Sequence, residues 1–320
     1  MLSKYIKTLN LQPIEIHNFM QKGTFENMSS GLQLLMVVVI IGISTIVITL
    51  LSYLLAIPVV GLDEFSLSGS TGILRYLQIS QAFSVFIIPP VIAAFLFSKT
   101  PMKWLWFRKS DSRLIIISLL LFLISIPLIS FLAEFNSSMK FPAFMQSIEQ
   151  WMRSTEKMNN DLIFKFLDTK QPLIILINIF MIVLIPAFGE EMLFRGTIQP
   201  LFQKIFKSQH IAVWVTAFLF SAIHLQFLTF LPRFILGAML GYLLVYGKSL
   251  WYPIVGHFIN NFTSLIVFYY YRATKPEINP LEPSSGDFNS IIILSSFAVT
   301  ILLFYVFIKL CKKPEIIKLQ

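Results

Sequence analysis

Long apolar runs separated by short polar segments dominate the pattern of this chain. Several runs reach the roughly 18 to 25 residues that a helix needs to cross about 30 Å of hydrocarbon. Backbone groups in lipid must satisfy one another, so such runs form helices. The pattern predicts an all-α polytopic membrane protein with about eight transmembrane helices: 31–58, 75–98, 114–133, 173–195, 211–228, 231–247, 251–271 and 290–310.

Composition supports this fold class. The chain is 56% hydrophobic and 13% charged, against roughly 25% charged residues in an average soluble domain. The net charge of +9 is typical of basic loops that orient a membrane protein, so membrane lipids are expected partners and nucleic acid is not.

Basic residues fall in segments that an eight-span topology puts on one side of the membrane, whereas the opposite loops carry balanced charge. Cytoplasmic loops are enriched in Lys and Arg. The N- and C-termini are therefore predicted to be cytoplasmic. The basic residues concerned are Lys4, Lys7, Lys22, Lys99, Lys103, Arg108, Lys109, Arg113, Lys204, Lys207, Lys248, Lys309, Lys312 and Lys313.

One membrane domain accounts for the organisation of the chain. Pro89, Pro90 and Pro127 are expected to kink or break their helices, and the single cysteine, Cys311, excludes an intrachain disulfide. The predicted regions are a polar, interfacial N-terminal arm (1–30), accessory transmembrane helices 1–3 (31–133), an extracytoplasmic loop with short helices near 143–153 and 158–169 (134–172), core helices 4–7 (173–272), and a loop, last transmembrane helix and basic cytoplasmic tail (273–320).

Few ionisable or amide side chains occur within the apolar runs. A charge at the bilayer centre costs roughly 2.5 to 3.5 kcal/mol on insertion scales, so these residues are candidates for function. They are Glu190, Glu191, Arg195, His224, Arg233, His257, Asn260 and Asn261.

The stretch G-E-E-M-L-F-R-G, 189–196, holds three of them. Glu191 and Arg195 are four residues apart, so they share a helix face and can pair. Glu190 is rotated by about 100° around the helix and cannot share that partner in the same way, which favours Glu190 as a general base. The alternative is that both glutamates only pair with Arg195 to fix the bundle.

Two histidines complete the candidate site. His224, in F-S-A-I-H, and Glu190 are equally far from a turn centred near residue 207, so an antiparallel helix pair places them at similar depth. His224 could equally be a hydrogen-bonded core residue. His257 and Asn261 are four apart on one helix face and can donate hydrogen bonds to one point, as an oxyanion or a water or metal site requires. Placing His257 at the same depth would need a tilted helix or an unwound segment after Arg195.

Other chemistries lack their residues. There is no H-E-x-x-H zinc helix and no G-x-S-G motif, and every aspartate falls in a loop. What remains is attack by a water that Glu190 and His224 activate, with His257 and Asn261 holding the oxyanion. A zinc ion held by Glu190, His224 and His257 would serve as well, so the cofactor is left open between none and zinc.

Three motifs in order resemble one known family. E-E-x-x-x-R is present as Glu190 to Arg195, F-x-x-x-H as Phe220 to His224, and H-x-x-x-N as His257 to Asn261. Together they resemble the CPBP (CAAX protease and bacteriocin-processing, Abi) intramembrane endopeptidases, which are related to the type II CAAX prenyl endopeptidase. The resemblance covers about residues 173–272.

The resemblance implies an intramembrane endopeptidase whose cavity opens to the cytoplasm. Glu190 and His224 would activate the water and His257 and Asn261 would hold the oxyanion. Glu191, Arg195 and Phe220 would support the site. The substrate would be a peptide or protein, lipid-modified or not, and the expected location is a bacterial cytoplasmic (inner) membrane. A non-catalytic scaffold or bacteriocin-immunity protein and a proton-coupled transporter are the alternatives.

Overall fold

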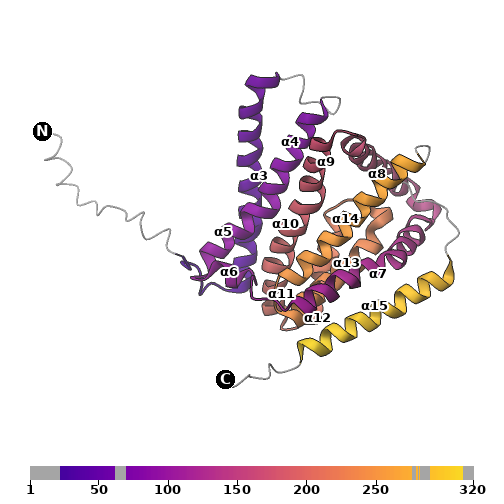
Figure 1. Ribbon diagram of the computed structural model, residues 1–320. Coiled ribbons are helices and arrows are strands. Elements are labelled where there is room, and N and C mark those ends of the chain that lie inside the picture. The colour runs from indigo at the N-terminus through magenta and orange to yellow at the C-terminus, as the bar shows by residue number, and fades with distance from the viewer. Residues whose placement is uncertain (1–21, 62–69, 276–278, 280, 282–288, 313–320) are drawn as a thin grey trace, which may run out of the picture.

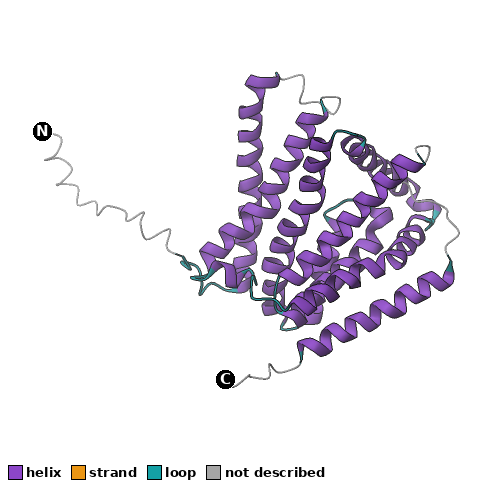
Figure 2. Cartoon of the chain, viewed as in Figure 1, coloured by secondary structure: helices purple, strands orange, loops and turns teal. Residues whose placement is uncertain are grey.

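A computed structural model describes residues 22–61, 70–275, 279, 281 and 289–312 of the chain. These described residues form helices and loops without a strand (Figure 2). Most of the predicted N-terminal arm and of the basic tail lies outside them. In chain order the elements are α3 (Ser30–Val60), α4 (Thr71–Ala82), η2 (Phe83–Ile87), α5 (Ile88–Phe97), α6 (Pro101–Trp104), α7 (Ser112–Ser137), η3 (Ala143–Met145), α8 (Gln146–Leu167), α9 (Pro172–Asn178), η4 (Ile179–Leu184), α10 (Ile185–Leu193), η5 (Phe194–Ile198), α11 (Gln199–Phe206), α12 (Gln209–Ala222), η6 (Phe227–Thr229), α13 (Phe230–Gly247), α14 (Trp251–Thr274) and α15 (Ser290–Cys311).

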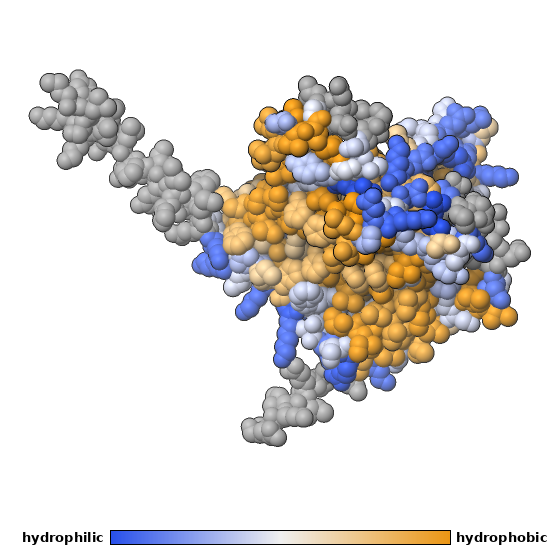
Figure 3. Space-filling model, turned by 45° about the horizontal axis from the view of Figure 1, so that its top comes forward, coloured by the Kyte–Doolittle hydropathy of each residue, from blue (hydrophilic) through white to orange (hydrophobic). Residues whose placement is uncertain are grey.

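The prediction of an all-α polytopic membrane protein is confirmed. Large apolar side chains cover the outside of the bundle, as on α3, where Leu54 and Leu55 are exposed, and apolar residues form a broad area in Figure 3. An apolar surface of this extent is typical of a face that contacts lipid. Within the described residues, six helical runs are long and apolar enough to cross a membrane: Ser30–Val60, Thr71–Phe97, Ser112–Ser137, Pro172–Phe206, Phe227–Gly247 and Ser290–Cys311.

The predicted count of eight spans is not confirmed. The two further helices lie where they were predicted, but α12 has only 14 residues, or roughly 21 Å at 1.5 Å per residue. The helix α14 has 24 residues and is not among the six, because it carries the polar side chains of the H-x-x-x-N motif. Eight spans and cytoplasmic termini therefore stay predictions.

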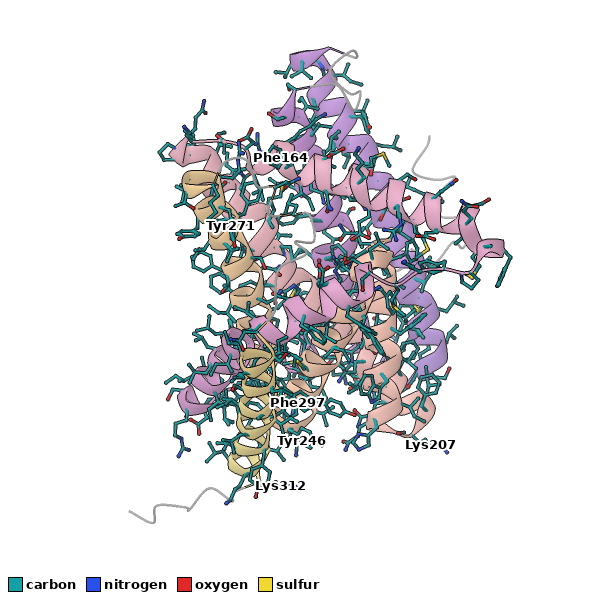
Figure 4. All side chains as sticks on the ribbon, turned by 90° about the vertical axis from the view of Figure 1, so that its right-hand side faces the viewer. Phe164, Lys207, Tyr246, Tyr271, Phe297 and Lys312 are labelled. Atoms are coloured by element: carbon teal, nitrogen blue, oxygen red, sulfur yellow. The ribbon has the colours of Figure 1, made fainter. Side chains whose placement is uncertain are left out.

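Basic residues outnumber acidic ones at one end of the bundle, whereas the end with α8 carries both signs, as in the pair Arg153–Glu149. Lys207, after α11, and Lys312, after α15, lie at one end, and Phe164 and Tyr271 lie at the other (Figure 4).

The predicted loop with two short helices is instead η3 followed by the single helix α8. No Pro or Gly interrupts residues 146–167, so the helix is continuous.

Proline residues follow three wide helical turns. The π-helical turns η2, η4 and η5 precede Pro89–Pro90, Pro186 and Pro200 respectively. Proline has no N–H and its ring clashes with the carbonyl four residues earlier, and a π-turn relieves this clash within a continuous helix. The expected local break at Pro89 and Pro90 is thus a π-turn, whereas α7 continues through Pro127. Predicted span 173–195 likewise continues to Phe206.

Small residues bring α12 and α13 together. A Cβ atom on Gly237 would lie 3.2 Å from Ala217 and 3.2 Å from the Phe220 ring, and one on Gly241 would lie 2.8 Å from Gln199. This spacing of two glycines four residues apart permits close helix contact in membranes. The hairpin α12–α13 packs on η5 and α11, which continue the helical run that carries Glu190 (Figure 1).

Replacement of Gly237 by Leu is expected to lower the free energy of unfolding by about 1 to 3 kcal/mol, because the added side chain overpacks the contact between α12 and α13. Thermal unfolding of the purified protein in detergent measures this. The control is Gly42→Leu on α3, where a Cβ atom meets nothing within 4 Å. Equal melting temperatures for the two variants would contradict the proposed packing.

The enrichment of Lys and Arg in cytoplasmic loops predicts which end of the bundle faces the cytoplasm. In a Cys311→Ser background, a membrane-impermeant maleimide added to intact cells should label Arg153→Cys on α8, whereas Lys207→Cys should react only after permeabilisation. Both positions are exposed, so accessibility depends on the side of the membrane. The reverse labelling pattern would place the lysine-rich end outside.

Candidate active site

A buried ion pair lies at the centre of the bundle. Arg195 Nη1 lies 2.7 Å from Glu191 Oε1, and neither side chain has any exposed surface. Arg195 Nη2 donates to the carbonyl of Gly237 on α13 (3.0 Å), and the guanidinium lies 4.3 Å from the centre of the Phe220 ring. The predicted pairing is therefore present, and it joins α10, α12 and α13.

The same carboxylate oxygen also orients His257. His257 Nδ1 lies 2.9 Å from Glu191 Oε1. A carboxylate can only accept, so Nδ1 carries the hydrogen and Nε2 of the neutral ring is left with a lone pair. That Nε2 lies 3.9 Å from Glu190 Oε2. Of the two alternatives that the sequence left open, a tilted helix or an unwound segment after Arg195, the unwound segment is absent. The chain there forms the π-turn η5 and stays helical.

His224 lies in the loop that follows the C-terminal end of α12. The helix α12 ends at Ala222, and Leu225 has φ 52°, a left-handed conformation that is unfavourable for a residue with a Cβ atom. His224 Nδ1 donates to the carbonyl of Phe220 at 2.7 Å, which again leaves Nε2 without a hydrogen. This Nε2 lies 4.0 Å from Glu190 Oε2.

Three acceptor atoms thus converge on one small space. They are Nε2 of His224, Nε2 of His257 and Oε2 of Glu190, and this oxygen is buried without a hydrogen-bond partner among the described residues. At 3.9 and 4.0 Å they are too far apart for direct hydrogen bonds. Lone pairs that face one another need a shared proton donor or a cation between them, so the arrangement suits a water molecule or a metal ion.

Phe220 contacts each part of this site. Its ring lies 5.3 Å from the His224 ring and 5.9 Å from the His257 ring, both edge to face, and Arg195 packs on it. Its carbonyl fixes the hydrogen of His224. One aromatic residue therefore sets the positions of both imidazoles, in agreement with the geometry expected of a supporting residue.

The side-chain amide of Asn261 forms two hydrogen bonds, one with the backbone and one with Asn260. Its Nδ2 donates to the carbonyl of Ile182 (3.1 Å), and its Oδ1 accepts from Asn260 (3.1 Å). Pro186, four residues after Ile182, has no N–H to offer that carbonyl. One N–H of Asn261 remains for the cavity, so the amide is less available as an oxyanion donor than its spacing from His257 suggested.

A cavity of about 650 Å³ holds these groups at one side. Its wall is mostly apolar and includes Phe122 of α7, Phe166 of α8 and Phe268 of α14, whereas Glu190, both histidines, Asn260 and Asn261 supply polar atoms. The cavity extends along α14 toward α8, which belongs to the end of the bundle away from Lys207 and Lys312 (Figure 4). The expected opening of the cavity to the cytoplasm stays a prediction, because the side of the membrane on which α8 lies is not established.

Zinc was the metal that the residue types suggested. The His, His and Glu donor set suits a catalytic zinc ion, whose ligand atoms at 2.0 to 2.1 Å lie roughly 3.3 Å from one another. The separations from Glu190 Oε2 are longer, 3.9 and 4.0 Å. In the described part of the chain, no three His, Cys, Asp or Glu side chains are close enough as they stand to hold a metal ion. The three side chains are of the types that bind zinc, but the distances from Glu190 Oε2 to the two Nε2 atoms would have to shorten for a zinc ion to bind.

Two contributing residues, Gln226 and Glu156, were not singled out from the sequence, and Arg233 was named there only as a candidate. Gln226 accepts from Arg233 Nη2 at 2.5 Å, and both line the cavity. Glu156 of α8 is buried and accepts from the N–H of Leu228 (2.8 Å) and the hydroxyl of Thr229 (3.1 Å), which satisfies the hairpin tip beside His224. Its helical position could have indicated this burial, because Glu156 follows Met152 by four residues and so shares the inward face of α8.

Comparison with known proteins agrees with these motifs. Residues 172–263 match the family model described as Type II CAAX prenyl endopeptidase Rce1-like. A Bacillus subtilis (strain 168) protein named "Uncharacterized protein YpbD" is 33% identical over 86 residues, which are 26% of this chain and 41% of that protein. The chain therefore matches less than half the length of this relative, and no solved structure matches. The match agrees with an integral membrane protein that is similar to CAAX-type proteases in this segment. Residues 172–263 of this chain therefore resemble an Rce1-like type II CAAX prenyl endopeptidase domain.

Proposed function

We propose that the chain is an intramembrane endopeptidase that hydrolyses a peptide bond with a water held by Glu190, His224 and His257. The observation that carries this proposal is the convergence of two bare Nε2 atoms on the buried, unpartnered Oε2 of Glu190. A scaffold would gain nothing from three acceptors that face one another, because such groups are costly when buried. A hydrolase uses them to hold and deprotonate water.

In this mechanism Glu190 accepts a proton from the water, and the water oxygen attacks the carbonyl carbon. The carbonyl electron pair moves to its oxygen, which becomes the oxyanion of a tetrahedral intermediate. As the intermediate collapses, the C–N bond breaks and the amine leaves with the proton that Glu190 took from the water, passed directly or through Nε2 of His224. Glu191 keeps its carboxylate on Arg195 and His257 and takes no part in proton transfer.

The cavity defines the class of substrate. A mostly apolar space of about 650 Å³ suits a short peptide segment with apolar side chains, with or without an attached lipid. Glu190 lies near the middle of the 35-residue helical run Pro172–Phe206. We therefore infer cleavage at membrane depth, deeper than the position near the cytoplasmic face that the sequence suggested.

A zinc ion bound by Glu190, His224 and His257 would supply an acidified water in place of the glutamate base. The glutamate version is preferred because the present separations exceed those of zinc ligands.

The first test removes the base without changing its shape. Glu190→Gln is expected to keep the fold and to lower peptide cleavage by roughly 10²- to 10⁴-fold, because the amide cannot take a proton from water. Membrane peptidomes of cells with wild type and variant measure the effect. The matched control is Glu149→Gln, a half-buried carboxylate that pairs with Arg153 on α8, away from the cavity. An unchanged peptidome with a folded Glu190→Gln variant would favour a non-catalytic scaffold.

The second test addresses the metal. After prolonged treatment with a strong chelator, the purified protein is expected to keep its cleavage activity and to contain no zinc by elemental analysis. Loss of activity that added zinc restores would overturn the glutamate version and assign Glu190, His224 and His257 as ligands.

A further inference from the structure

Arg233 is a cation at the wall of the candidate active site that neither the ion pair nor the proposed water uses. It lies one turn into α13 and lines the cavity with Glu190 and His224. Its Nη2 donates to the neutral Gln226 side chain, and its Nη1 is buried without a hydrogen-bond partner among the described residues. Charged groups at membrane depth are costly and usually serve a function.

The nearest carboxylates are already engaged elsewhere. Both oxygens of Glu156 accept hydrogen bonds from the hairpin tip, and Oε2 of Glu190 faces the two imidazoles. In the described part of the chain, Arg233 forms no ion pair within 4 Å. Its charge nevertheless acts on Glu190 and on His224, so it is near the reacting groups.

The donors expected from the sequence are, in contrast, partly consumed. Asn261 gives an N–H to the carbonyl of Ile182. His257 gives its hydrogen to Glu191, so neutral His257 has none at Nε2 for an oxyanion. Among the described residues that line the cavity, Arg233 is the cationic side chain that can donate to an oxyanion, beside the one remaining N–H of Asn261.

We propose that Arg233 Nη1 is a donor to the oxyanion of the tetrahedral intermediate, an inference that rests on the proposed endopeptidase function. When Glu190 takes the proton of the attacking water, its negative charge disappears and the carbonyl oxygen gains one. The net charge of the cavity is unchanged, and the new anion faces a guanidinium. An additional carboxylate on the substrate would instead add a third negative charge beside Glu190 and Glu156, so an anchoring role for a substrate carboxylate is disfavoured.

The test uses the full-length protein in lipid vesicles with a library of internally quenched peptides, followed by kinetics on the peptide cleaved fastest. Arg233→Met is expected to lower kcat by roughly 10²- to 10³-fold, as loss of an oxyanion donor does, with KM changed by less than about 3-fold. Arg233→Lys keeps a cation and should recover part of the loss. Gln226→Leu, which leaves Nη1 in place, should have a smaller effect. Thermal unfolding checks each fold, and Arg233→Gln replaces Arg233→Met if the latter does not fold.

The outcomes separate the two proposals. Wild-type kcat in a folded Arg233→Met or Arg233→Gln variant, together with an inactive Glu190→Gln variant, would overturn the role of Arg233 alone. A loss that appears only in KM would also overturn it and would assign Arg233 to substrate binding. Cleavage by Glu190→Gln at the wild-type rate would overturn the proposed function itself.

Discussion

The Glu191 carboxylate is the interaction on which the rest of the site depends. One of its oxygens accepts from both Arg195 and His257, with no exposed surface on either ion-pair partner. Removing one member of a buried pair leaves an uncompensated charge and typically costs about 3 to 5 kcal/mol. The pair therefore fixes α10 against α13 and α14, and by holding Nδ1 of His257 it also decides which nitrogen faces Glu190. Stability and the protonation state of the site are set by the same contact.

Proline residues determine the position of Asn261 and the shape of the helical run that carries the two glutamates. Pro186 cannot donate to the carbonyl of Ile182, and Asn261 of α14 takes that carbonyl instead. The π-turn η5 before Pro200 widens the helix within the E-E-x-x-x-R motif, where the Thr197 hydroxyl donates to the carbonyl of Met192. Wide turns of this kind occur often at functional sites. Here they allow a continuous helical run to carry both glutamates at the middle of the bundle.

The sequence was informative where a rule of spacing applied. Residues four apart on a helix meet, so the Glu191–Arg195 pair could be predicted, and the antiparallel hairpin correctly placed His224 beside Glu190. The sequence contains no indication of features that depend on tertiary contacts. The break after Ala222 depends on Asn136 and Glu156, which satisfy the backbone near Leu228 and Leu231 from distant helices. The same holds for Asn261, whose helical spacing to His257 is correct while its amide is bound elsewhere.

The matched segment is not the whole site. Residues 172–263 contain the proposed reacting groups, but the cavity is also lined by Gln78 of α4, Phe122 of α7 and Phe166 of α8. Phe122 packs so closely that a Cβ atom on Gly256 would lie 2.6 Å from its ring, one residue before His257. Arg75 of α4 donates to the carbonyl of Phe166 at 2.6 Å and so anchors α8. Chemistry and substrate shape are thus carried by different parts of the chain, and a relative that shares the three motifs alone need not share the substrate.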